Sequence, residues 1–492
     1  MPFSNVDTLL ILPELFLTAA GLGLLVYATM VRREHEPRIA ILSIVALAVT
    51  GLLLGVSTRF AGSLPRSAFG GMLVVDRFGL YFQGLVILAA IITILFSLRF
   101  VGESPYPGGE YYGLIIFTTV GMLFMAAGTH LASIYISLEL MALSQYVLAG
   151  YFKRETKSIE AAAKYFVLGA FSSGILLYGI SLVYGASGTM TLSGLSTALA
   201  ASNKSPIFLV GIILIACGLF FKIASAPFHV WAPDVYEGAP TPISAFFAVG
   251  PKIAAYAIFA RIFFSGFGSS TADWTAVIAA SAALTMVVGN VGALMQTNVK
   301  RMLGYSSIGH AGYALLGLLA YRPGTVGGSA GDRDFGLWAI LIYLAAYALM
   351  NLGAFGLVVL LESKGYAAES VDDFNGLSKK NPLAAATMVV FLLSLAGIPP
   401  TAGFVGKYFL FSAAMKAGWF WLTLLAVLMS AVSLFYYFRI VRAMYMVEGS
   451  GELGWREQPA VSVAIGLCAA GTLAIGVLPQ IFVAFAKTCL LR

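Results

Sequence analysis

Fourteen apolar runs, each about long enough to cross a lipid bilayer, constrain the fold of this chain more than any other feature. A transmembrane helix needs about 20 predominantly apolar residues. The pattern therefore predicts an all-α polytopic membrane protein with about 14 transmembrane helices. The runs lie at residues 8–30, 38–58, 78–100, 112–128, 131–151, 159–185, 206–225, 243–265, 274–296, 302–320, 335–361, 383–411, 419–446 and 459–486. The longest gaps hold Gly, Ser and charge and are predicted to be loops: 186–205, 321–334, 362–382 and 447–458.

The composition agrees with this prediction. Hydrophobic residues make up 60% of the chain and charged residues only 10%, whereas soluble domains carry about 25% charged residues. A soluble fold could not bury this much apolar surface. The net charge of +7 would suggest nucleic acid in a soluble protein. Here the basic residues lie mostly in short gaps, where they orient a membrane protein, so we expect a lipid bilayer and no nucleic acid as partner.

Basic residues are unevenly distributed between alternate gaps, and such a bias sets the orientation of a membrane protein. The richer set includes residues 153–157 and 379–380, and the poorer set includes Arg59 and Arg77. We place the richer set in the cytoplasm. An even number of spans then puts both termini outside. The first run, 8–30, is too long for a signal peptide and lacks a basic segment before it, which predicts a retained span.

Motifs for metal, nucleotide or redox chemistry are absent from the sequence. The three cysteines, Cys217, Cys468 and Cys489, lie far apart in apolar runs, which leaves iron–sulfur, zinc and disulfide frameworks unsupported. There is no HExxH motif, and GFVGKY at 403–408 lacks the first glycine and the Ser or Thr of a phosphate loop. No dinucleotide fingerprint follows a strand. We therefore expect no cofactor, no metal and no redox chemistry in this chain itself.

Two of the apolar runs are interrupted by proline. Residues 221–242 read FKIASAPFHVWAPDVYEGAPTP, and residues 394–411 read SLAGIPPTAGFVGKYFLF. Each break has a lysine close by, Lys222 before the first and Lys407 after the second. A matched pair of Pro- and Gly-interrupted spans indicates a transporter built from inverted repeats, with its site at the breaks. A lysine before one break and after the other is what inversion would produce.

Ionisable residues inside the apolar runs are the main functional candidates, because each costs roughly 2.5–3.5 kcal/mol at the bilayer centre on insertion scales. Broken helices in a membrane line water or packed protein, so these groups are expected to form a row for proton transfer. In chain order they are Glu139, Lys164, Lys222, Lys252, His310 and Lys407, with His229, Asp234 and Glu237 in the first break as accessory candidates.

Each candidate also has a structural interpretation. Glu139 and Lys164 could form an ion pair that only holds two helices together. Lys164 lies near a helix end and could extend to the interface. His310 could be a hydrogen-bonded core residue, although its ordinary pKa suits proton relay. Asp234 and Glu237 could be loop residues. Burial makes the charge of a lysine depend on its neighbours, which favours the functional interpretation for the lysines.

At these residues the chain resembles the antiporter-like membrane subunits of respiratory NADH–quinone oxidoreductase, complex I, over about residues 110–440. The motifs that carry the resemblance are SLELMALSQYVLAGY, EAAAKYFVLGAFSSGILLYG, KIASAPFHVWAPDVYEGAPTPISAF, NVKRMLGYSSIGHAGY and LAGIPPTAGFVGKYFLF. It is most similar to the N type, called subunit 2 in mitochondria. The L and M types carry a histidine-rich stretch where this chain has FFAVGPKIA. The M type has glutamate in place of Lys407, and the L type continues into a long lateral helix beyond the position of Arg492.

The resemblance implies a fold of fourteen helices with two inverted five-helix repeats, each with a discontinuous helix. The repeats would span 112–265 and 274–446, flanked by segments 1–111 and 447–492. It also implies roles. Glu139 and Lys164 would form a glutamate–lysine pair, and Lys222 would be the lysine of the first broken helix. Lys252 and His310 would form a central axis that leads to Lys407 as the exit residue.

The function implied is that of a proton-translocating subunit of NADH–quinone oxidoreductase in a bacterial plasma membrane. Protons would enter from the cytoplasm and leave outside. NADH, FMN, iron–sulfur clusters and quinone would be bound by sister subunits, and the M-, K-, J- and L-type membrane subunits would be partners. The chain would belong to an enzyme only as a subunit of this translocase. The alternatives are a subunit of a cation/proton antiporter, a purely structural scaffold, and a subunit of a relative of complex I fed by ferredoxin or F420.

Overall fold

The protein is almost entirely helical, as the sequence predicts. Within the described part of the chain, the regular β-structure is one short antiparallel hairpin, β1 (Arg66–Ala68) and β2 (Leu73–Val75), in which Arg66 lies opposite Val75. The computed structural model describes residues 5–31, 36–102, 106, 108–201, 205–321, 334–362, 368–449 and 459–491.

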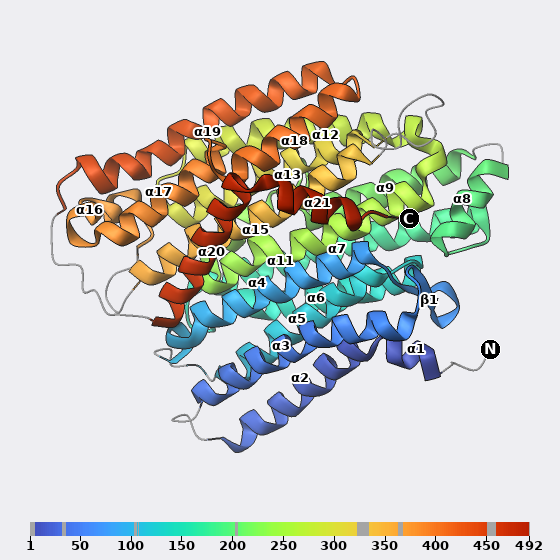
Figure 1. The fold of residues 1–492 in the computed structure, drawn as a ribbon, viewed down its shortest axis with the longest axis horizontal. Coiled ribbons are helices and arrows are strands. Elements are labelled where there is room, and N and C mark those ends of the chain that lie inside the picture. The colour runs from blue at the N-terminus through green and yellow to red at the C-terminus, as the bar shows by residue number, and fades with distance from the viewer. Residues whose placement is uncertain are drawn as a thin grey trace.

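Long apolar helices open the chain and form one side of the molecule (Figure 1). There α2 packs against both α3 and α5, and α4 joins this side to the centre through α11. Much of the outward surface of α2 and α3 is apolar, as expected of helices that face lipid or another membrane subunit. The helices are α1 (Asn5–Leu10), α2 (Leu12–Met30), α3 (Glu36–Ala61) and α4 (Arg77–Gly102).

The next group contains the first broken helix, in which α9 ends at Lys222 and α10 follows after a gap. The gap 186–205 was predicted to be a loop, and this was wrong, because it contains α8. The apolar residues Leu192, Leu195 and Leu199 recur at helical spacing and are buried against the π-helical turn Arg261–Gly266. The helices are α5 (Gly108–Ala127), α6 (Leu131–Ala149), α7 (Thr156–Ser187), α8 (Leu192–Ala201), α9 (Pro206–Lys222), α10 (Trp231–Gly238) and α11 (Thr241–Ala260).

The second broken helix lies in the following group, between α17 and α18. At the C-terminal end, the run 459–486 was predicted as one span, but α20 ends at Val477. Pro479 lacks the N–H that would continue the helix, and a separate helix, α21, begins there. The helices are α12 (Thr271–Leu294), α13 (Val299–Leu319), α15 (Phe335–Leu361), α16 (Leu377–Lys380), α17 (Pro382–Ala396), α18 (Ala402–Lys416), α19 (Phe420–Met446), α20 (Pro459–Val477) and α21 (Pro479–Thr488).

Eleven helices among the described residues are long and apolar enough to cross a membrane. The other three predicted runs are not among these eleven helices, because a helix break shortens two of them and polar residues interrupt the third. α9 is short because it stops at the first break, and the run 383–411 is divided into α17 and α18. α13 has spanning length but carries Lys300, Arg301 and His310. The predicted fold class, an all-helical multi-span membrane protein with discontinuous helices, is therefore confirmed.

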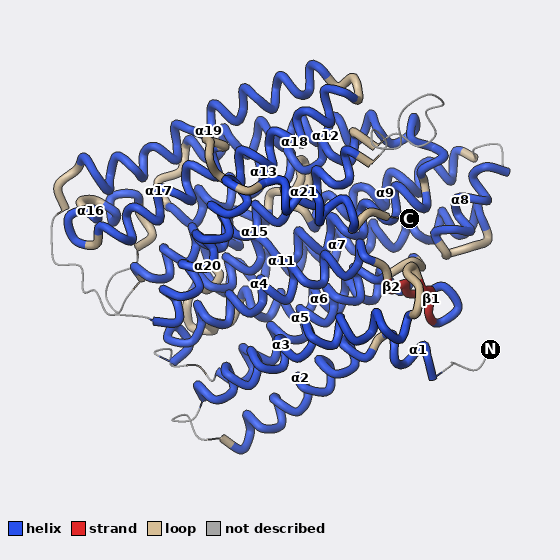
Figure 2. The backbone as a smooth tube through the Cα atoms, in the orientation of Figure 1, coloured by secondary structure: helices blue, strands red, loops and turns tan. Residues whose placement is uncertain are grey.

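Both groups consist almost entirely of helices (Figure 2), and they share one order of elements. α5 packs on α6 as α12 packs on α13. α7 packs on both halves of the first broken helix, α9 and α10, as α15 packs on both halves of the second, α17 and α18. The centre of the molecule is formed by α11, which is buried along its whole length, and by α15, which is buried along most of it. The limits of the two repeats remain a prediction.

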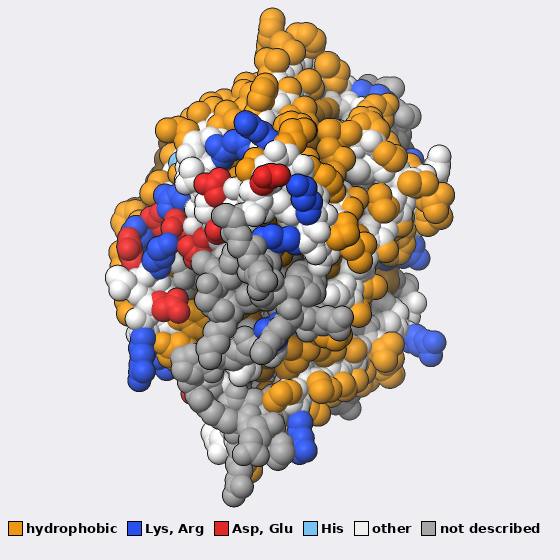
Figure 3. Space-filling model, turned by 90° about the vertical axis from the view of Figure 1, so that its left-hand side faces the viewer, with side chains coloured by type: hydrophobic (Ala, Val, Ile, Leu, Met, Phe, Trp, Pro, Cys, Tyr) orange, Lys and Arg blue, Asp and Glu red, His pale blue; other side chains and the backbone are white. Residues whose placement is uncertain are grey.

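Charged residues gather at the end of the molecule that includes α16 (Figure 3). Acidic and basic side chains lie side by side there, and some members of the richer basic set, such as Lys157 and Lys379, form ion pairs. α1 and the β1–β2 hairpin lie at the opposite end (Figure 1). The terminal residues 1–4 and 492 lie outside the described residues. The predicted orientation, with both termini outside the cytoplasm, stays a prediction.

α12 and α13 cross closely, and this crossing positions the middle of α13. The first prediction concerns a substitution that disrupts the crossing. A Cβ atom on Gly289 of α12 would lie 2.2 Å from the backbone nitrogen of Gly309. We expect Gly289→Val to destabilise the protein by about 1–3 kcal/mol through overpacking, measured by thermal unfolding of the detergent-solubilised protein. Gly55→Val is the control, because a Cβ there has no neighbour within 4 Å. Equal stability of the two variants would contradict this account of the crossing.

Candidate functional site

The first helix break is held by hydroxyl groups of α12. α9 ends at Lys222, and the chain then turns past Ser225 and Ala226. The Ser225 hydroxyl shares hydrogen bonds with those of Ser281 and Thr285, at 2.8 and 2.6 Å, and the Ala226 N–H donates to Thr285 Oγ1 at 2.9 Å. Polar side chains thus satisfy backbone groups that the break releases, as a broken helix inside a membrane requires.

Lys222 lies at this break with its ammonium group deep in the protein. The side chain is only 4% exposed, and Nζ has no hydrogen-bond partner among the described residues. Nζ lies 6.0 Å from the centre of the Tyr146 ring and 5.5 Å from that of Phe221, within the range of cation–π attraction. The Glu139 carboxylate of α6 also acts electrostatically on it. The charge of Lys222 therefore depends on a carboxylate and two rings.

The structure does not form the predicted contact between Glu139 and Lys164. Lys164 Nζ lies 2.6 Å from Glu160, one turn earlier on α7, and 2.6 Å from Asp234 of α10, and its side chain is 41% exposed. Glu139 instead accepts a hydrogen bond from Ser173. Ser173 lies about 13 Å farther along α7 than Lys164 at 1.5 Å per residue. Glu139 thus contacts α7 at a different depth from that of Lys164.

Asp234 and Glu237 belong to a charged cluster rather than to a loop. Both lie on the short helix α10, where Arg301 of α13 lies 2.6 Å from Asp234 and 3.0 Å from Glu237. Lys157 at the start of α7 adds contacts of 3.2 Å to Glu237 and 3.4 Å to Glu369. The cluster connects α7, α10 and α13 and thereby joins the two groups of helices at one end of the molecule.

Lys252 lies in the fully buried helix α11, next to Pro251. Its side chain is 2% exposed, and Nζ donates to the backbone carbonyl of Ser307 at 2.7 Å and to the Ser307 hydroxyl. Both acceptors belong to α13. A buried ammonium group needs such acceptors because it has lost its hydration, and here a neighbouring helix supplies them.

His310, in the middle of α13, lies between two tyrosines. Its Nδ1 is 2.6 Å from the Tyr343 hydroxyl of α15, and its Nε2 is 3.4 Å from the Tyr437 hydroxyl of α19. Tyr437 also shares a hydrogen bond with Ser306, which is adjacent in sequence to Ser307. Because hydroxyl groups both donate and accept, this chain of side chains suits proton exchange.

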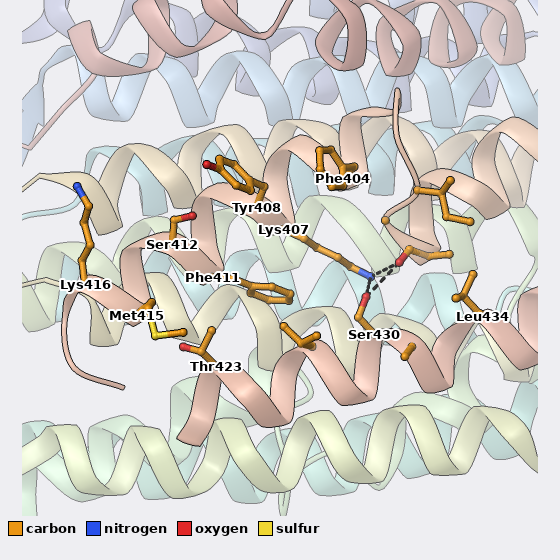
Figure 4. A pocket seen from close by; sticks show the side chains of 15 residues that line it. Phe404, Lys407, Tyr408, Phe411, Ser412, Met415, Lys416, Thr423, Ser430 and Leu434 are labelled. Carbon is orange, nitrogen blue, oxygen red and sulfur yellow. Dashed lines mark hydrogen bonds between the residues drawn. The ribbon is translucent and has the colours of Figure 1, made fainter. Parts of the chain in front are cut away.

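Lys407 is held by carbonyl groups that the second break releases. Gly397 ends α17 with a φ of +89°, a conformation that favours glycine. Lys407 Nζ donates to the carbonyls of Leu395 at 2.8 Å and Ala396 at 3.0 Å. It also donates to the Ser430 hydroxyl at 2.8 Å (Figure 4). The side chain is 4% exposed. The break thus places a buried cation against the carbonyl end of a half-helix, where the helix dipole is negative.

A cavity of about 680 Å³ adjoins Lys407 between α18 and α19. Its lining is mostly apolar and includes Tyr408 and Phe411, which Figure 4 shows on the same half-helix as Lys407. On the inner side, Lys407 Nζ lies 4.9 Å from the centre of the Tyr313 ring, and that ring packs edge-on against His310 with 5.6 Å between centres. The Tyr313 ring therefore lies between His310 and Lys407.

The structure brings some of the predicted residues together and leaves others apart. Lys252, His310 and Lys407 lie in one polar region across α11, α13 and α18. Within the described ranges no hydrogen bond joins Lys222 to Lys252, and Nδ1 of His229 has no hydrogen-bond partner. A group of three or more His, Cys, Asp or Glu side chains that could hold a metal is not found in that part of the chain.

The tyrosines around His310 were not indicated by the sequence pattern. Tyr313, Tyr343 and Tyr437 are buried in apolar helices. A tyrosine in such a run is equally consistent with an interfacial anchor. Only the packing of α13, α15 and α19 shows that the hydroxyl groups of Tyr343 and Tyr437 converge on His310, while the Tyr313 ring packs against it.

A second group that the sequence pattern did not indicate is the buried pair of Asp76 and Arg261. Arg261 Nη2 lies 2.6 Å from Asp76 Oδ1, Nη1 lies 2.9 Å from Oδ2, and Nε donates to the Ala126 carbonyl at 2.8 Å. Nearby, Glu14 accepts a hydrogen bond of 2.7 Å from Gln83. In the sequence, the signal that could have pointed to this pair was a single arginine, Arg261, within an apolar run. The bidentate pair ties α4 to α11, which indicates a structural role.

Broken helices with lysines buried at or beside the breaks, together with central titratable side chains, define an antiporter-like membrane protein. Residues 128–433 match the family described as NADH:quinone oxidoreductase/Mrp antiporter, TM. The chain belongs to this family of membrane subunits.

Its relatives narrow this assignment. The chain is 42% identical over 490 residues to NADH-quinone oxidoreductase subunit N of Trichlorobacter lovleyi, which covers 99% of this chain and 97% of that protein. It is 43% identical to the same subunit of Rhodospirillum rubrum, with 90% and 88% covered. Among solved structures, a chain of respiratory complex I from Thermus thermophilus with bound aureothin superposes with a TM-score of 0.80, 31% identity, and coverage of 96% of this chain and 98% of that chain.

The buried pair of Asp76 and Arg261 gives the second prediction. Arg261→Ala would leave the Asp76 carboxylate buried without its partner, and we expect a loss of stability of about 3–5 kcal/mol. Lys379→Ala is the control, because its ion pair with Glu448 is exposed on both sides, and surface pairs contribute little. The measurement is the thermal unfolding of each purified variant. A stability of Arg261→Ala equal to that of the control would show that the pair does not hold α4 to α11.

Proposed function

We propose that the chain is a proton-translocating membrane subunit of an NADH–quinone oxidoreductase. The observation that carries this proposal is the burial of Lys222, Lys252 and Lys407 in an apolar helix bundle, each 4% exposed or less. Ionisable residues at such depth are costly and mark ion pathways. The names of the relatives support the same function. Together they favour proton transfer over a cation site built from carboxylates.

In this proposal the chain contributes to catalysis only as part of the complex. Electrons pass from NADH through FMN and iron–sulfur clusters to quinone in sister subunits. This chain carries protons and binds none of these groups. Its partners are the M-, K-, J- and L-type membrane subunits. It lies in the inner membrane of a bacterium with both termini outside the cytoplasm, so that the charged cluster around Asp234 faces the cytoplasm.

Proton uptake would begin at this charged cluster. Lys164, Asp234 and Glu237 hold the entrance, and Glu139 controls the charge of Lys222 directly, because its carboxylate acts on that ammonium group. A charge change in a neighbouring subunit would reach Glu139 first, since this side chain is only partly buried. Lys164 would therefore act at the entrance and not as the partner of Glu139.

From Lys222 the proton would pass to Lys252 and His310 and leave at Lys407. Ser307 contacts Lys252, and the hydroxyl groups of Ser306 and Tyr437 continue to His310. A buried lysine retains its proton only while nearby acceptors stabilise the ammonium, so a change at one member shifts the next. The proposed path would thus consist of successive transfers among these candidate residues.

We also propose that the two repeats span 112–265 and 274–446. The matching order of helices and the two discontinuous helices support these limits. In each repeat a lysine lies at the break, Lys222 at the end of α9 and Lys407 in the first turns of α18. The segments 1–111 and 447–492 lie outside the repeats and would serve packing and assembly.

A second candidate function is cation/proton antiport, or proton transfer in a complex fed by another donor such as ferredoxin or F420. A chain of membrane-bound sulfane sulfur reductase, an archaeal respiratory membrane complex, superposes with a TM-score of 0.82 and 26% identity, covering 99% of this chain and 97% of that chain. This structural similarity supports a related redox complex as the alternative function. A purely structural scaffold predicts that neutral replacement of the buried lysines is tolerated.

The third prediction tests proton transfer at Lys222. We expect Lys222→Ala to lower NADH-driven proton uptake by membranes at least about tenfold, in the range of lost proton-transfer groups, and to lower quinone reduction with it. Lys379→Ala is the matched control, because this lysine is exposed. Assembly is verified by native gel electrophoresis. Normal pumping in an assembled Lys222→Ala complex would leave a scaffold or another transporter as the function.

The fourth prediction separates proton pumping from cation antiport. In inverted vesicles without NADH, a sodium gradient should produce no proton movement that depends on Lys222. With NADH present, proton movement should be independent of sodium concentration. The measurement uses a pH-sensitive dye in vesicles with and without Lys222→Ala. Sodium-driven proton movement that the substitution abolishes would favour the antiporter.

A further inference from the structure

Two polar stripes face each other where α6 packs against α7. On α6, Glu139 and Tyr146 are separated by seven residues, about two helical turns, and so share a face. On α7, Gly169, Ser172 and Ser173 share a face because they are three and four residues apart. The Ser173 hydroxyl already contacts Glu139. The stripes end beside Lys222, the last residue of α9.

The Tyr146 hydroxyl occupies a notch that only glycine leaves open. A Cβ atom at position 169 would lie 2.1 Å from this oxygen. The Tyr146 side chain is 6% exposed, and its hydroxyl has no hydrogen-bond partner among the described residues. Its ring packs at 4.8 Å against that of Tyr165 and at 5.7 Å against that of Phe166. Packing therefore fixes the ring and directs the hydroxyl to the α7 notch.

Three other buried polar atoms without a hydrogen-bond partner among the described residues belong to residues near Tyr146 or near the notch in α7. They are Nζ of Lys222, Nε2 of Gln145 and Oγ of Ser172. Most buried polar groups are hydrogen-bonded, and each unpaired one costs about 1–3 kcal/mol. A shared set of donors and acceptors on adjacent helices meets the requirement of a bound water, which needs two to four polar partners.

We infer that Tyr146 is a relay residue that carries a proton between Glu139 and Lys222 through water held at this notch. The inference rests on the proposed function and adds a residue to its first transfer. The Glu139 carboxylate acts electrostatically on both the Tyr146 phenol and the Lys222 ammonium. Lys164 forms ion pairs with Glu160 and Asp234 instead. The Tyr146 phenol is therefore the titratable group that we place between Glu139 and Lys222.

The transfer balances in protons and charge. A protonated Glu139 carboxyl gives its proton to the bound water, and the water passes one of its protons to the Tyr146 oxygen. As the new O–H bond forms, the original phenol O–H bond breaks toward the neutral amine of Lys222. Glu139 ends as a carboxylate, Lys222 ends as an ammonium, and both the water and Tyr146 are unchanged.

Tyr146→Phe is the decisive variant, because it removes one oxygen that bonds to no described side chain and retains the packed ring. In the assembled complex we expect NADH-driven proton uptake to fall about tenfold or more, with an increased solvent deuterium isotope effect. A packing role alone would change neither quantity. Tyr178→Phe is the matched control, since this tyrosine of α7 is 61% exposed.

Gly169→Ala tests the notch independently. The added methyl group displaces the phenol, so this variant should lose proton uptake as Tyr146→Phe does. Gly174→Ala on the same helix should not, because a Cβ there meets no neighbour within 4 Å. Wild-type uptake and isotope effect in Tyr146→Phe would overturn the relay. If Lys222→Ala still abolishes uptake in that case, the proposed function stands without Tyr146. If Lys222→Ala is also normal, both are overturned.

Discussion

Burying lysine ammonium groups in a protein that is itself surrounded by lipid is the constraint on which the rest of this structure depends. Removing such a charge from water costs several kcal/mol per ion even after relaxation. The structure offsets this cost with oxygen acceptors. Lys407 receives two carbonyls released by the second helix break, and Lys252 receives the carbonyl and hydroxyl of Ser307. At Lys407 the second helix break supplies acceptors that the buried charge needs.

Lys222 differs from the other two lysines because its ammonium group contacts rings and unpaired polar atoms rather than carbonyls. In the proposed function, Glu139 is the neighbour that acts on the charge of Lys222, in addition to burial. Where acceptors are fixed, as at Lys407, the proton is held in a defined place. The proposed path uses both situations, since Lys222 would respond to a signal and Lys407 would retain the proton until release.

Much of the fold could be predicted from the chain, because spanning helices follow from apolar length and breaks follow from proline. The site was predicted less completely. Glu139 and Lys164 were expected to pair, yet Glu139 contacts Ser173 of α7 and Lys164 contacts Asp234 of α10. Tyr437, Tyr343 and Arg261 were not anticipated, because an aromatic or basic residue in an apolar run has several interpretations when its neighbours are unknown.

The sequence by itself determined which residues carry charge inside the membrane and where the helices break. Both are local properties, set by side-chain chemistry and by the missing N–H of proline. Only the tertiary structure decided which acceptor each charge meets. Asp234 is 70 residues from Lys164, and Ser307 is 55 residues from Lys252. Such contacts depend on how helices cross and at what depth, and the spacing of residues along one helix does not fix either quantity.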